Sequence, residues 1–404
     1  MVKGGVTAAK GFMAAGIYAG IKKKRKDMAL VYTKKAARGA GVFTQNIVKA
    51  APVNWGIKVT KDSDLVHAVV INSGIANAAT GQEGEDNNRI MAETVATELE
   101  IPVSSVYTAS TGVIGQELPI DKIIEGIKEL KDNLASDIKS GLMAADAIRT
   151  TDTFTKECAV SFMIGDKEVV IGGMSKGSGM IHPNMATLLG VITTDVSISK
   201  ELLQEALSED VKRTFNMISI DRDTSTNDSV FLLANGAAEN VEITSKNEDY
   251  YNFCKALNIV TRKLSRLIAS GGEGASKLIE ATVEGATNEE VAIKISKSII
   301  SSNLVKTAMF GNDANWGRIL CAMGYSGGGF NPDMVDLYME SEFGKLQIAE
   351  KGLARDYSEE EATKILSASE VKITIDLNEG EGKATAWGCD LSYDYVKINA
   401  DYRS

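Results

Sequence analysis

Apolar runs and helical repeats alternate along the chain and predict a mixed α/β fold. Short β-type apolar runs predict strands at residues 28–32, 65–71, 188–192 and 230–234. Apolar residues recurring every three or four positions predict helices at 86–99, 121–134, 199–207 and 250–270. A further helix is predicted to begin at the capping box Thr287-Asn288-Glu289-Glu290 and to end near residue 302.

The stretch from Lys176 to Asp195 combines two unlike halves. It is glycine-rich and polar up to Asn184, and residues 188–192 read as a buried strand. Ala186 and Thr187 lie at the seam, where the Thr187 hydroxyl could attack the Ala186 carbonyl and cleave the chain. The new α-amino group, with an unperturbed pKa of roughly 7.7–8.0, could then act as the base for the same hydroxyl. A purely structural loop-to-strand junction is the alternative that this chemistry leaves open.

Composition indicates an ordinary globular chain. It has 404 residues, 44% of them hydrophobic and 24% charged, which is enough for a core divided between two lobes. The net charge of −10 argues against non-specific nucleic-acid binding. No stretch approaches the roughly 20 apolar residues of a membrane span, and no signal peptide is apparent. We therefore expect a soluble, cytoplasmic protein.

One strongly basic run, Lys22-Lys23-Lys24-Arg25-Lys26, interrupts this acidic chain. It could be a nuclear signal or a phosphate patch. Because Asp27 and an apolar strand follow at once, we predict a solvated turn.

The small number of histidines and cysteines limits the catalytic and metal-binding sites that the chain could form. The two histidines, His67 and His182, and four widely spaced cysteines offer little for a histidine triad or a metal site. Asp221, Asp223 and Asp228 suggest a metal site, but they lack EF-hand spacing and its terminal Glu. We expect no metal.

Several motifs resemble the ornithine acetyltransferase (glutamate N-acetyltransferase) family of arginine biosynthesis. The most specific is Pro183-Asn184-Met185-Ala186-Thr187, and the resemblance covers nearly the whole chain. Other similar segments are residues 4–21, 43–53, 108–119, 215–228, 310–319 and 396–404. Gln45, Arg222 and the terminal Ser404 depart from the family pattern, in which threonine, glycine and threonine are usual.

The resemblance implies a two-lobed α/β sandwich of the N-terminal-nucleophile type. It implies self-cleavage between Ala186 and Thr187 into an α chain (1–186) and a β chain (187–404), assembled as a heterotetramer of two α and two β chains. The implied reaction moves acetyl from N-acetylornithine to glutamate through acetyl-Thr187. No bound cofactor is implied, although some members also accept acetyl-CoA as a co-substrate.

The resemblance also implies site residues. Thr187 would be the nucleophile, and Thr111 with Gly112 the oxyanion hole. Substrate-binding residues would be Thr150 or Thr151, Lys176, Thr187, Glu273, Asn399 and Ser404. From the residues alone, Lys176 could instead be a solvated loop lysine and Glu273 an exposed residue after a helix.

Two other functions share parts of this pattern. A self-cleaving threonine aminopeptidase or amidase would use the same nucleophile and release its acyl product to water. An amino-acid-binding protein would keep its chain uncut. Cleavage on a denaturing gel separates the binding protein from the two enzymes, and dependence on glutamate separates transferase from hydrolase.

Overall fold

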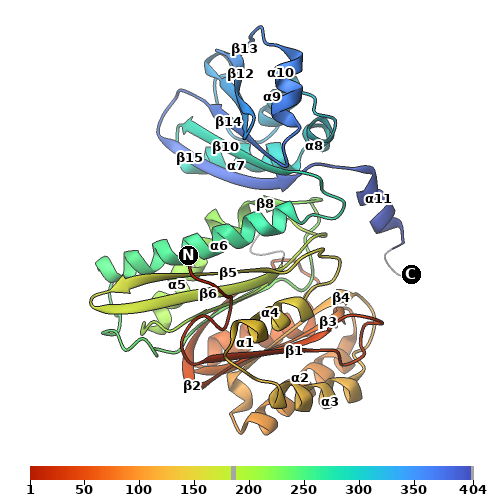
Figure 1. Ribbon diagram of the computed structural model, residues 1–404, viewed down its shortest axis with the longest axis vertical. Helices are drawn as coiled ribbons and strands as arrows, with labels where there is room; N and C mark the ends of the chain where they lie inside the picture. The colour runs from red at the N-terminus through yellow and green to blue at the C-terminus, as the bar shows by residue number, and fades with distance from the viewer. Residues whose placement is uncertain (183–187, 402–404) are drawn as a thin grey trace. The chain divides into compact units, whose positions relative to one another are not determined.

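The computed structural model describes residues 1–182 and 188–401, and these form two compact units, each with its own sheet (Figure 1). The first unit comprises residues 1–177, 188–216 and 224–264. The second unit comprises residues 178–182, 217–223 and 265–401. Helices pack on both sheets, so the predicted α/β class with two parts is confirmed.

The sheet of the first unit has eight strands, in the order β4-β3-β2-β9-β7-β6-β5, with β1 paired to β2 off this path. The strands are β1 (Phe12–Ile17), β2 (Met28–Phe43), β3 (Val66–Ile75), β4 (Val106–Val113), β5 (Lys156–Ile164), β6 (Lys167–Lys176), β7 (Leu189–Thr194) and β9 (Ser229–Ala234). The central strand β7 is buried along its whole length, as predicted, because it pairs with β6 on one side and β9 on the other.

Helices cover this sheet on both faces. They are α1 (Ala51–Asp62), α2 (Gly81–Leu99), α3 (Ile120–Asp132), α4 (Ile138–Ala147) and α5 (Lys200–Arg213), with a short 3-10 helix η1 (Val103–Ser105). Alternate residues of β3 face opposite cores. Val69 and Ile71 pack in a cluster that includes α4, whereas Val70 packs with Met91 of α2 and Ile123 of α3.

The sheet of the second unit has the order β13-β12-β11-β14-β10-β15-β8. The strands are β8 (Ile218–Ser219), β10 (Leu278–Ala286), β11 (Asp336–Ser341), β12 (Gly344–Glu350), β13 (Leu353–Ala354), β14 (Glu370–Asp376) and β15 (Gly382–Cys389). The helices are α7 (Glu289–Ser301), α8 (Asn303–Phe310), α9 (Trp316–Gly324), α10 (Glu359–Leu366) and α11 (Tyr393–Ala400), with 3-10 helices η2 (Phe215–Met217), shared with the first unit, and η3 (Pro332–Met334).

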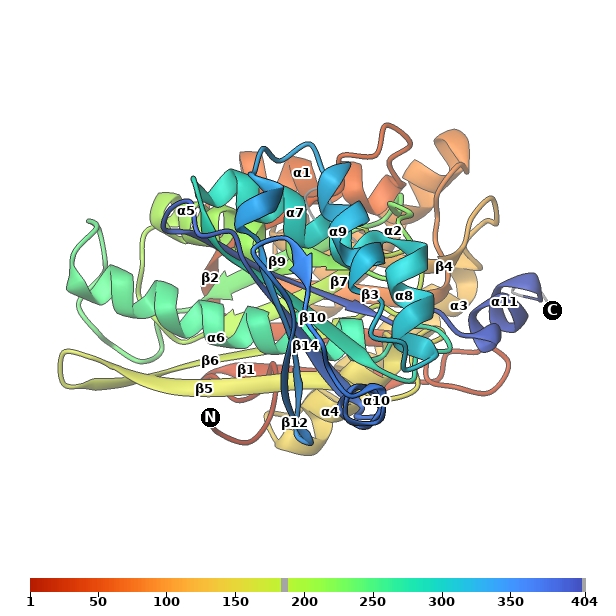
Figure 2. The same ribbon diagram turned by 90° about the horizontal axis from the view of Figure 1, so that it is seen from above.

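The long helix α6 (Glu248–Ser270) belongs to the first unit up to Leu264 and to the second from Ser265. In the first unit it runs along the hairpin of β5 and β6 (Figure 2). Side chains of Val260 and Leu264 lie close to Gly173 of β6, where a larger residue would crowd them.

Helix ends differ from the sequence predictions for identifiable reasons. α2 begins five residues early, because its first turn at 81–85 contains no apolar residue to show the periodicity. Ser199 caps α5, which continues to Arg213. The prediction of a capping box that begins at Thr287 is wrong. The N-cap residue of α7 is Asn288, whose side chain accepts a hydrogen bond from the Val291 N–H.

The basic run forms a turn, but it is not fully solvated. Lys22 is half-buried, and its Nζ donates to the Arg149 carbonyl at 2.8 Å. Burial lowers the pKa of Lys22 to about 8. The prediction of a solvated turn is therefore wrong for Lys22, whereas Lys23, Lys24 and Arg25 are exposed.

No helix of the described residues is both long and apolar enough to cross a membrane.

Candidate active site

The predicted oxyanion-hole residues lie at the end of β4, next to the parallel strand β3. Gly112 pairs with Gly74 and has φ of +135°, and a Cβ there would lie 2.2 Å from the Gly74 carbonyl carbon. Only glycine fits this close approach. The buried Asn227 side chain donates to the carbonyls of Ala76 (2.5 Å) and Ser110 (2.8 Å). The ends of β3 and β4 are thus held together beside Thr111.

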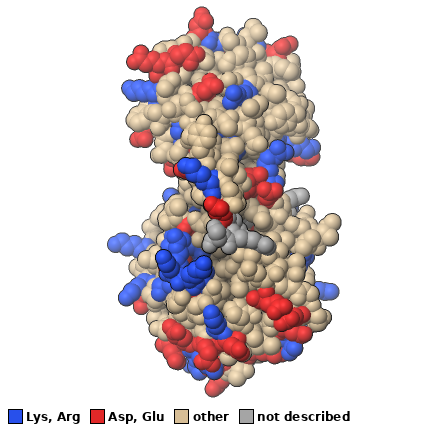
Figure 3. All heavy atoms as spheres, turned by 90° about the vertical axis from the view of Figure 1, so that its right-hand side faces the viewer, with Lys and Arg blue, Asp and Glu red and all other residues tan. Residues whose placement is uncertain are grey.

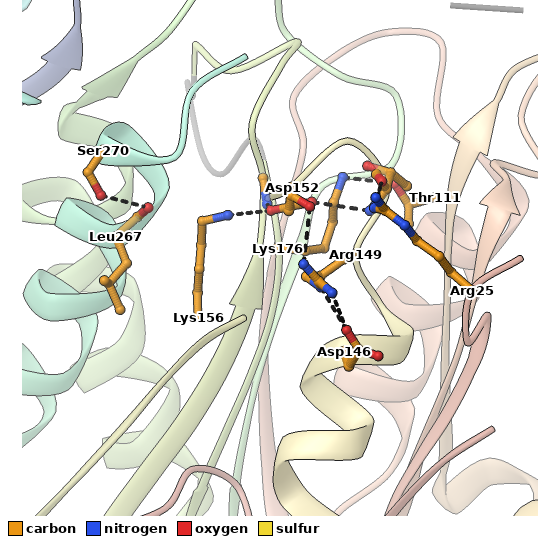
Figure 4. A network of polar contacts seen from close by, with 11 residues as sticks. Arg25, Thr111, Asp146, Arg149, Asp152, Lys156, Lys176, Leu267 and Ser270 are labelled. Atoms are coloured by element: carbon orange, nitrogen blue, oxygen red, sulfur yellow. Dashed lines mark hydrogen bonds and ion pairs between the residues drawn. The ribbon is translucent and has the colours of Figure 1, made fainter. Parts of the chain in front are cut away.

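Lys176 and Thr111, 65 positions apart, meet in the first unit. Lys176 is the last residue of β6 and is only 9% exposed, so it is not the solvated lysine considered as an alternative. Its Nζ donates to the Thr111 Oγ1 at 3.2 Å (Figure 4). Because the hydroxyl oxygen accepts from the ammonium, its proton can be directed to another acceptor. The Thr111 hydroxyl, a hydrogen-bond donor, and the Lys176 ammonium, a cation, therefore lie next to each other.

A buried carboxylate, Asp152, links this pair to its surroundings (Figure 4). Asp152 is fully buried, and its Oδ1 accepts from the Lys156 Nζ at 2.5 Å and from the Gly177 N–H at 2.8 Å. Gly177 directly follows Lys176, so this carboxylate fixes the backbone at the end of β6. Burial alone would raise the pKa of Asp152, but Lys156, Lys176 and the hydrogen bonds outweigh it and lower that pKa to about 2. The Asp152 carboxylate is thus ionised at pH 7, whereas burial lowers the pKa of Lys156 and Asp152 opposes that shift.

The predicted substrate-binding threonines belong to the same cluster. Thr150 and Thr151 are half-buried in the loop after α4. The Thr150 N–H donates to the Asp152 Oδ2 at 3.2 Å, and the Thr150 carbonyl accepts from Arg25 at 3.4 Å. The first unit therefore brings Thr111, Thr150 and Lys176 into one connected polar network.

Asp152→Asn should destabilise the protein strongly, because Lys156 would remain buried with its countercharge removed. Breaking a buried pair on one side typically costs about 3–5 kcal/mol. The free energy of unfolding, measured by denaturant titration, should fall by that order. Because the folded-state pKa of Asp152 is depressed, the same stabilisation is present above about pH 4 and is lost as pH falls through about 2.

A surface pair provides the control. Lys128 and Glu125 are 48% and 73% exposed, so Lys128→Met should cost less than about 1 kcal/mol. The double variant Asp152→Asn, Lys156→Met removes both charges and should recover part of the loss. Equal losses in Asp152→Asn and Lys128→Met would contradict the assignment.

The second unit brings together two other predicted residues, Glu273 and Asn399. Glu273 is 7% exposed, which excludes the alternative of an exposed residue after a helix. The Asn399 Nδ2, on α11, donates to the Glu273 Oε2 at 2.8 Å. The Glu273 N–H donates to the Ser178 carbonyl at 2.8 Å, and a Cβ on Gly179 would lie 2.3 Å from the Glu273 carboxylate. Glycine at 179 therefore leaves room for this carboxylate.

Asp221 holds the segment that precedes the predicted cleavage site. Its carboxylate accepts from the N–H groups of Met180 (2.6 Å) and Ile181 (2.8 Å). The His182 Nδ1 lies 3.0 Å from the Ser219 hydroxyl. Burial, with Lys297 and Arg222 nearby, lowers the pKa of His182 to about 4, so the ring is neutral at pH 7. The chain is thus fixed as far as residue 182.

Three predicted residues, Ala186, Thr187 and Ser404, lie outside the described residues. Among those described, no group of three or more His, Cys, Asp or Glu side chains could hold a metal ion. The sequence analysis missed the roles of Asp152, Asp221 and Asn227. A carboxylate among the hydroxyl residues 150–153, followed four positions later by Lys156, was the available signal for the first of them.

Comparison with known proteins matches these features to one family. The family model described as "ArgJ family" matches residues 13–404. The "Arginine biosynthesis bifunctional protein ArgJ 1" of Clostridium acetobutylicum is 50% identical over 97% of this chain and 96% of its own length. The "Arginine biosynthesis bifunctional protein ArgJ" of Caldanaerobacter subterraneus subsp. tengcongensis is 48% identical over the full length of both chains.

A solved structure agrees with the sequence relatives. The crystal structure of the arginine biosynthesis bifunctional protein ArgJ from Bacillus halodurans is 47% identical, with a TM-score of 0.50, and its match covers 52% of this chain and 97% of the solved chain. The mixed α/β fold is therefore that of an enzyme of arginine biosynthesis. The chain belongs to the ArgJ family, and the resemblance predicted from the sequence is confirmed.

Proposed function

We propose that this protein transfers acetyl from N-acetylornithine to glutamate through an acetyl ester on Thr187. Ornithine and N-acetylglutamate would be the products. The proposal also includes autocatalytic cleavage between Ala186 and Thr187, which yields an α chain of residues 1–186 and a β chain of residues 187–404. Family membership and the polar network around Thr111 and Lys176 support this function.

The observation that carries the proposal is the strand pairing next to the cleavage site. Leu189, the first residue of β7, pairs with Lys176, the last residue of β6. Thr187 stands two positions before Leu189 in the sequence. The described strand that follows the proposed nucleophile in the sequence therefore begins beside Lys176, which is hydrogen-bonded to Thr111.

The proposed acetyl transfer has two halves, and the same side chains of the protein act in both. The α-amino group of Thr187 takes the hydroxyl proton while Oγ1 attacks the acetyl carbonyl, and Thr111 and the Gly112 N–H stabilise the oxyanion. The C–N bond then breaks, and the proton passes to the departing amine of ornithine. In the second half, the glutamate amine attacks the ester carbonyl, its proton passes to the Thr187 α-amino group and from there to the Thr187 oxygen, and that oxygen leaves as the hydroxyl. The neutral, hydrogen-bonded His182 is not required as the base.

The coverage of the solved chain supports cleavage. Its match spans only 52% of this chain although 97% of the solved chain is included, whereas the sequence relatives match nearly all of both chains. A solved chain of about half the length is what a precursor cut near its middle would give. The proposed β chain of residues 187–404 is also about half of the protein.

We assign substrate recognition to the residues that the family resemblance implies, each argued from its contacts within its own unit. Lys176 would bind a substrate carboxylate, with Thr150 or Thr151 beside it. Glu273, oriented by Asn399, would bind a substrate ammonium group, and Ser404 would contribute a hydroxyl. Opposite charges held by buried or half-buried networks suit an amino-acid substrate, because desolvated charge-assisted contacts are strong.

Glu273→Gln should raise the KM for N-acetylornithine by about 30-fold or more, because it keeps the shape and removes the charge. Losing a charge-assisted contact to a desolvated ligand costs roughly 2–5 kcal/mol. Steady-state assays with N-acetylornithine and glutamate measure the effect. Self-cleavage should be nearly normal, because no free substrate takes part in it.

The matched control is Glu290→Gln in the same unit, an exposed glutamate paired with Lys294, which should leave KM within twofold. If Glu273→Gln instead blocks cleavage, Glu273 serves maturation through its contact with residues 178 and 179. An unchanged kcat/KM would remove Glu273 from the substrate site.

The proposed function also includes a second acetyl donor and an assembly of α and β chains. Acetyl-CoA would be an alternative acetyl donor, in keeping with the name "bifunctional" of the relatives. Two α and two β chains would form a heterotetramer, which the mass of the mature protein in solution tests. An aminopeptidase or amidase is the competing function, and acetyl release that is independent of glutamate would favour it over the transferase.

A further inference from the structure

The basic loop of residues 20–26 is held in a fixed position although Lys23, Lys24 and Arg25 are exposed. The fully buried Asp27 carboxylate accepts from the N–H groups of Ala19 (2.6 Å), Ile21 (2.7 Å) and Lys22 (2.9 Å). The Lys22 Nζ is bound to the Arg149 carbonyl at 2.8 Å. A charged loop with such anchors presents its cations at defined places.

The loop is anchored on the segment that enters the candidate active site. Arg25 reaches the Thr150 carbonyl at 3.4 Å, and Figure 4 shows Arg25 on the same side of the network as Thr111. Thr150 is in turn bound to Asp152, which fixes the end of β6 at Gly177. Arg25 is therefore linked to the Asp152 carboxylate through Thr150, by two successive hydrogen bonds.

Positive charge is in excess around this loop. Burial is the main cause of the lowered pKa of Lys22; Arg25 and Arg149 lower that pKa further, whereas Asp27 and Asp146 raise it. Asp146 is paired with Arg149, and the Asp27 carboxylate accepts backbone N–H groups. The loop lies on the side of the first unit that Figure 3 faces, where Lys and Arg side chains gather. The chain as a whole has a net charge of −10, but the cations of this loop repel one another locally. An anionic ligand would relieve that repulsion.

We propose that Lys23, Lys24 and Arg25 bind the phosphate groups of the acetyl-CoA donor. This inference rests on the proposed function and extends it to a residue-level site. The phosphates of coenzyme A carry several negative charges at one end of the molecule, and the reactive thioester is at the other end of a long flexible arm. Such a ligand suits an exposed basic loop anchored to the rim of a reaction site, because the phosphates need not enter that site.

The test is a double variant, Lys23→Ala, Lys24→Ala, assayed with three acetyl donors and glutamate. With acetyl-CoA, kcat/KM should fall by about tenfold or more and lose most of its dependence on salt, because exposed charge pairs are screened. With S-acetylpantetheine, which carries the thioester without phosphates, and with N-acetylornithine, kcat/KM should stay within twofold of wild type. The anchors Asp27, Lys22 and Arg25 are left intact so that the loop keeps its position.

A control with the same change of charge is Lys58→Ala, Lys61→Ala, two exposed lysines elsewhere in the first unit. It should leave all three donors unaffected. Calorimetric titration with coenzyme A provides a measurement independent of turnover, with binding expected in wild type and weakened at least tenfold in the loop variant. Equal losses with both thioesters, an equal loss in the control, or no binding of coenzyme A to wild type would overturn the proposal. Failure of wild type to transfer acetyl from N-acetylornithine to glutamate would refute the proposed function separately.

Discussion

Thr187→Ala should accumulate as a single full-length chain with no measurable acetyl transfer. Without the hydroxyl, the acyl group of Ala186 cannot shift to oxygen, and the chain is not cut. Without a cut, no α-amino group is released to serve as the base. A denaturing gel and transfer assays measure both effects, and loss of a nucleophile typically lowers turnover by about 10⁴-fold or more.

The position of the cut has its own measurement. N-terminal sequencing of the C-terminal fragment of wild type should begin Thr-Leu-Leu-Gly, which are residues 187–190. Thr187→Ser keeps the hydroxyl and should cut and turn over at reduced rates. A Thr187→Ala protein that is still cut, or a fragment that begins elsewhere, would remove Thr187 as the nucleophile.

Thr111→Ala should lower kcat by about 10²–10³-fold, because one oxyanion donor is lost. The same substitution should slow self-cleavage, since both steps pass through a tetrahedral oxyanion. Thr111 also accepts from Lys176, so part of the loss in kcat/KM should appear as a raised KM. Single-turnover kinetics of acetylation separate the two contributions.

Two substitutions control for damage to β4. Thr111→Ser keeps the hydroxyl and should recover most of the rate. Thr108→Val alters a fully buried threonine three positions earlier on the same strand, and the Thr108 hydroxyl has no hydrogen-bond partner among the described residues. It should leave acetylation within a few-fold of wild type. If Thr108→Val and Thr111→Ala lose activity equally, the effect belongs to the strand and not to an oxyanion donor.

Local patterns in the sequence determined the elements of the fold. The apolar run before residue 193 predicted β7, and the spacing of Val260, Leu264 and Ile268 predicted α6, because a residue's face in a strand or helix depends on its neighbours in sequence. The start of a helix was predicted too late where its first turn lacked apolar residues, as in α2. The family was also recognisable from short segments such as 183–187.

The sequence by itself therefore determined the α/β class, the family and the candidate residues, one segment at a time. Tertiary structure decided which of them meet: Lys176 with Thr111, Glu273 with Asn399, and Asp152 with Lys156. It also placed Lys22 against Arg149, where the sequence predicted a solvated turn. The physical reason is that a buried polar group must find a partner, and strand register and helix packing bring that partner from distant parts of the chain.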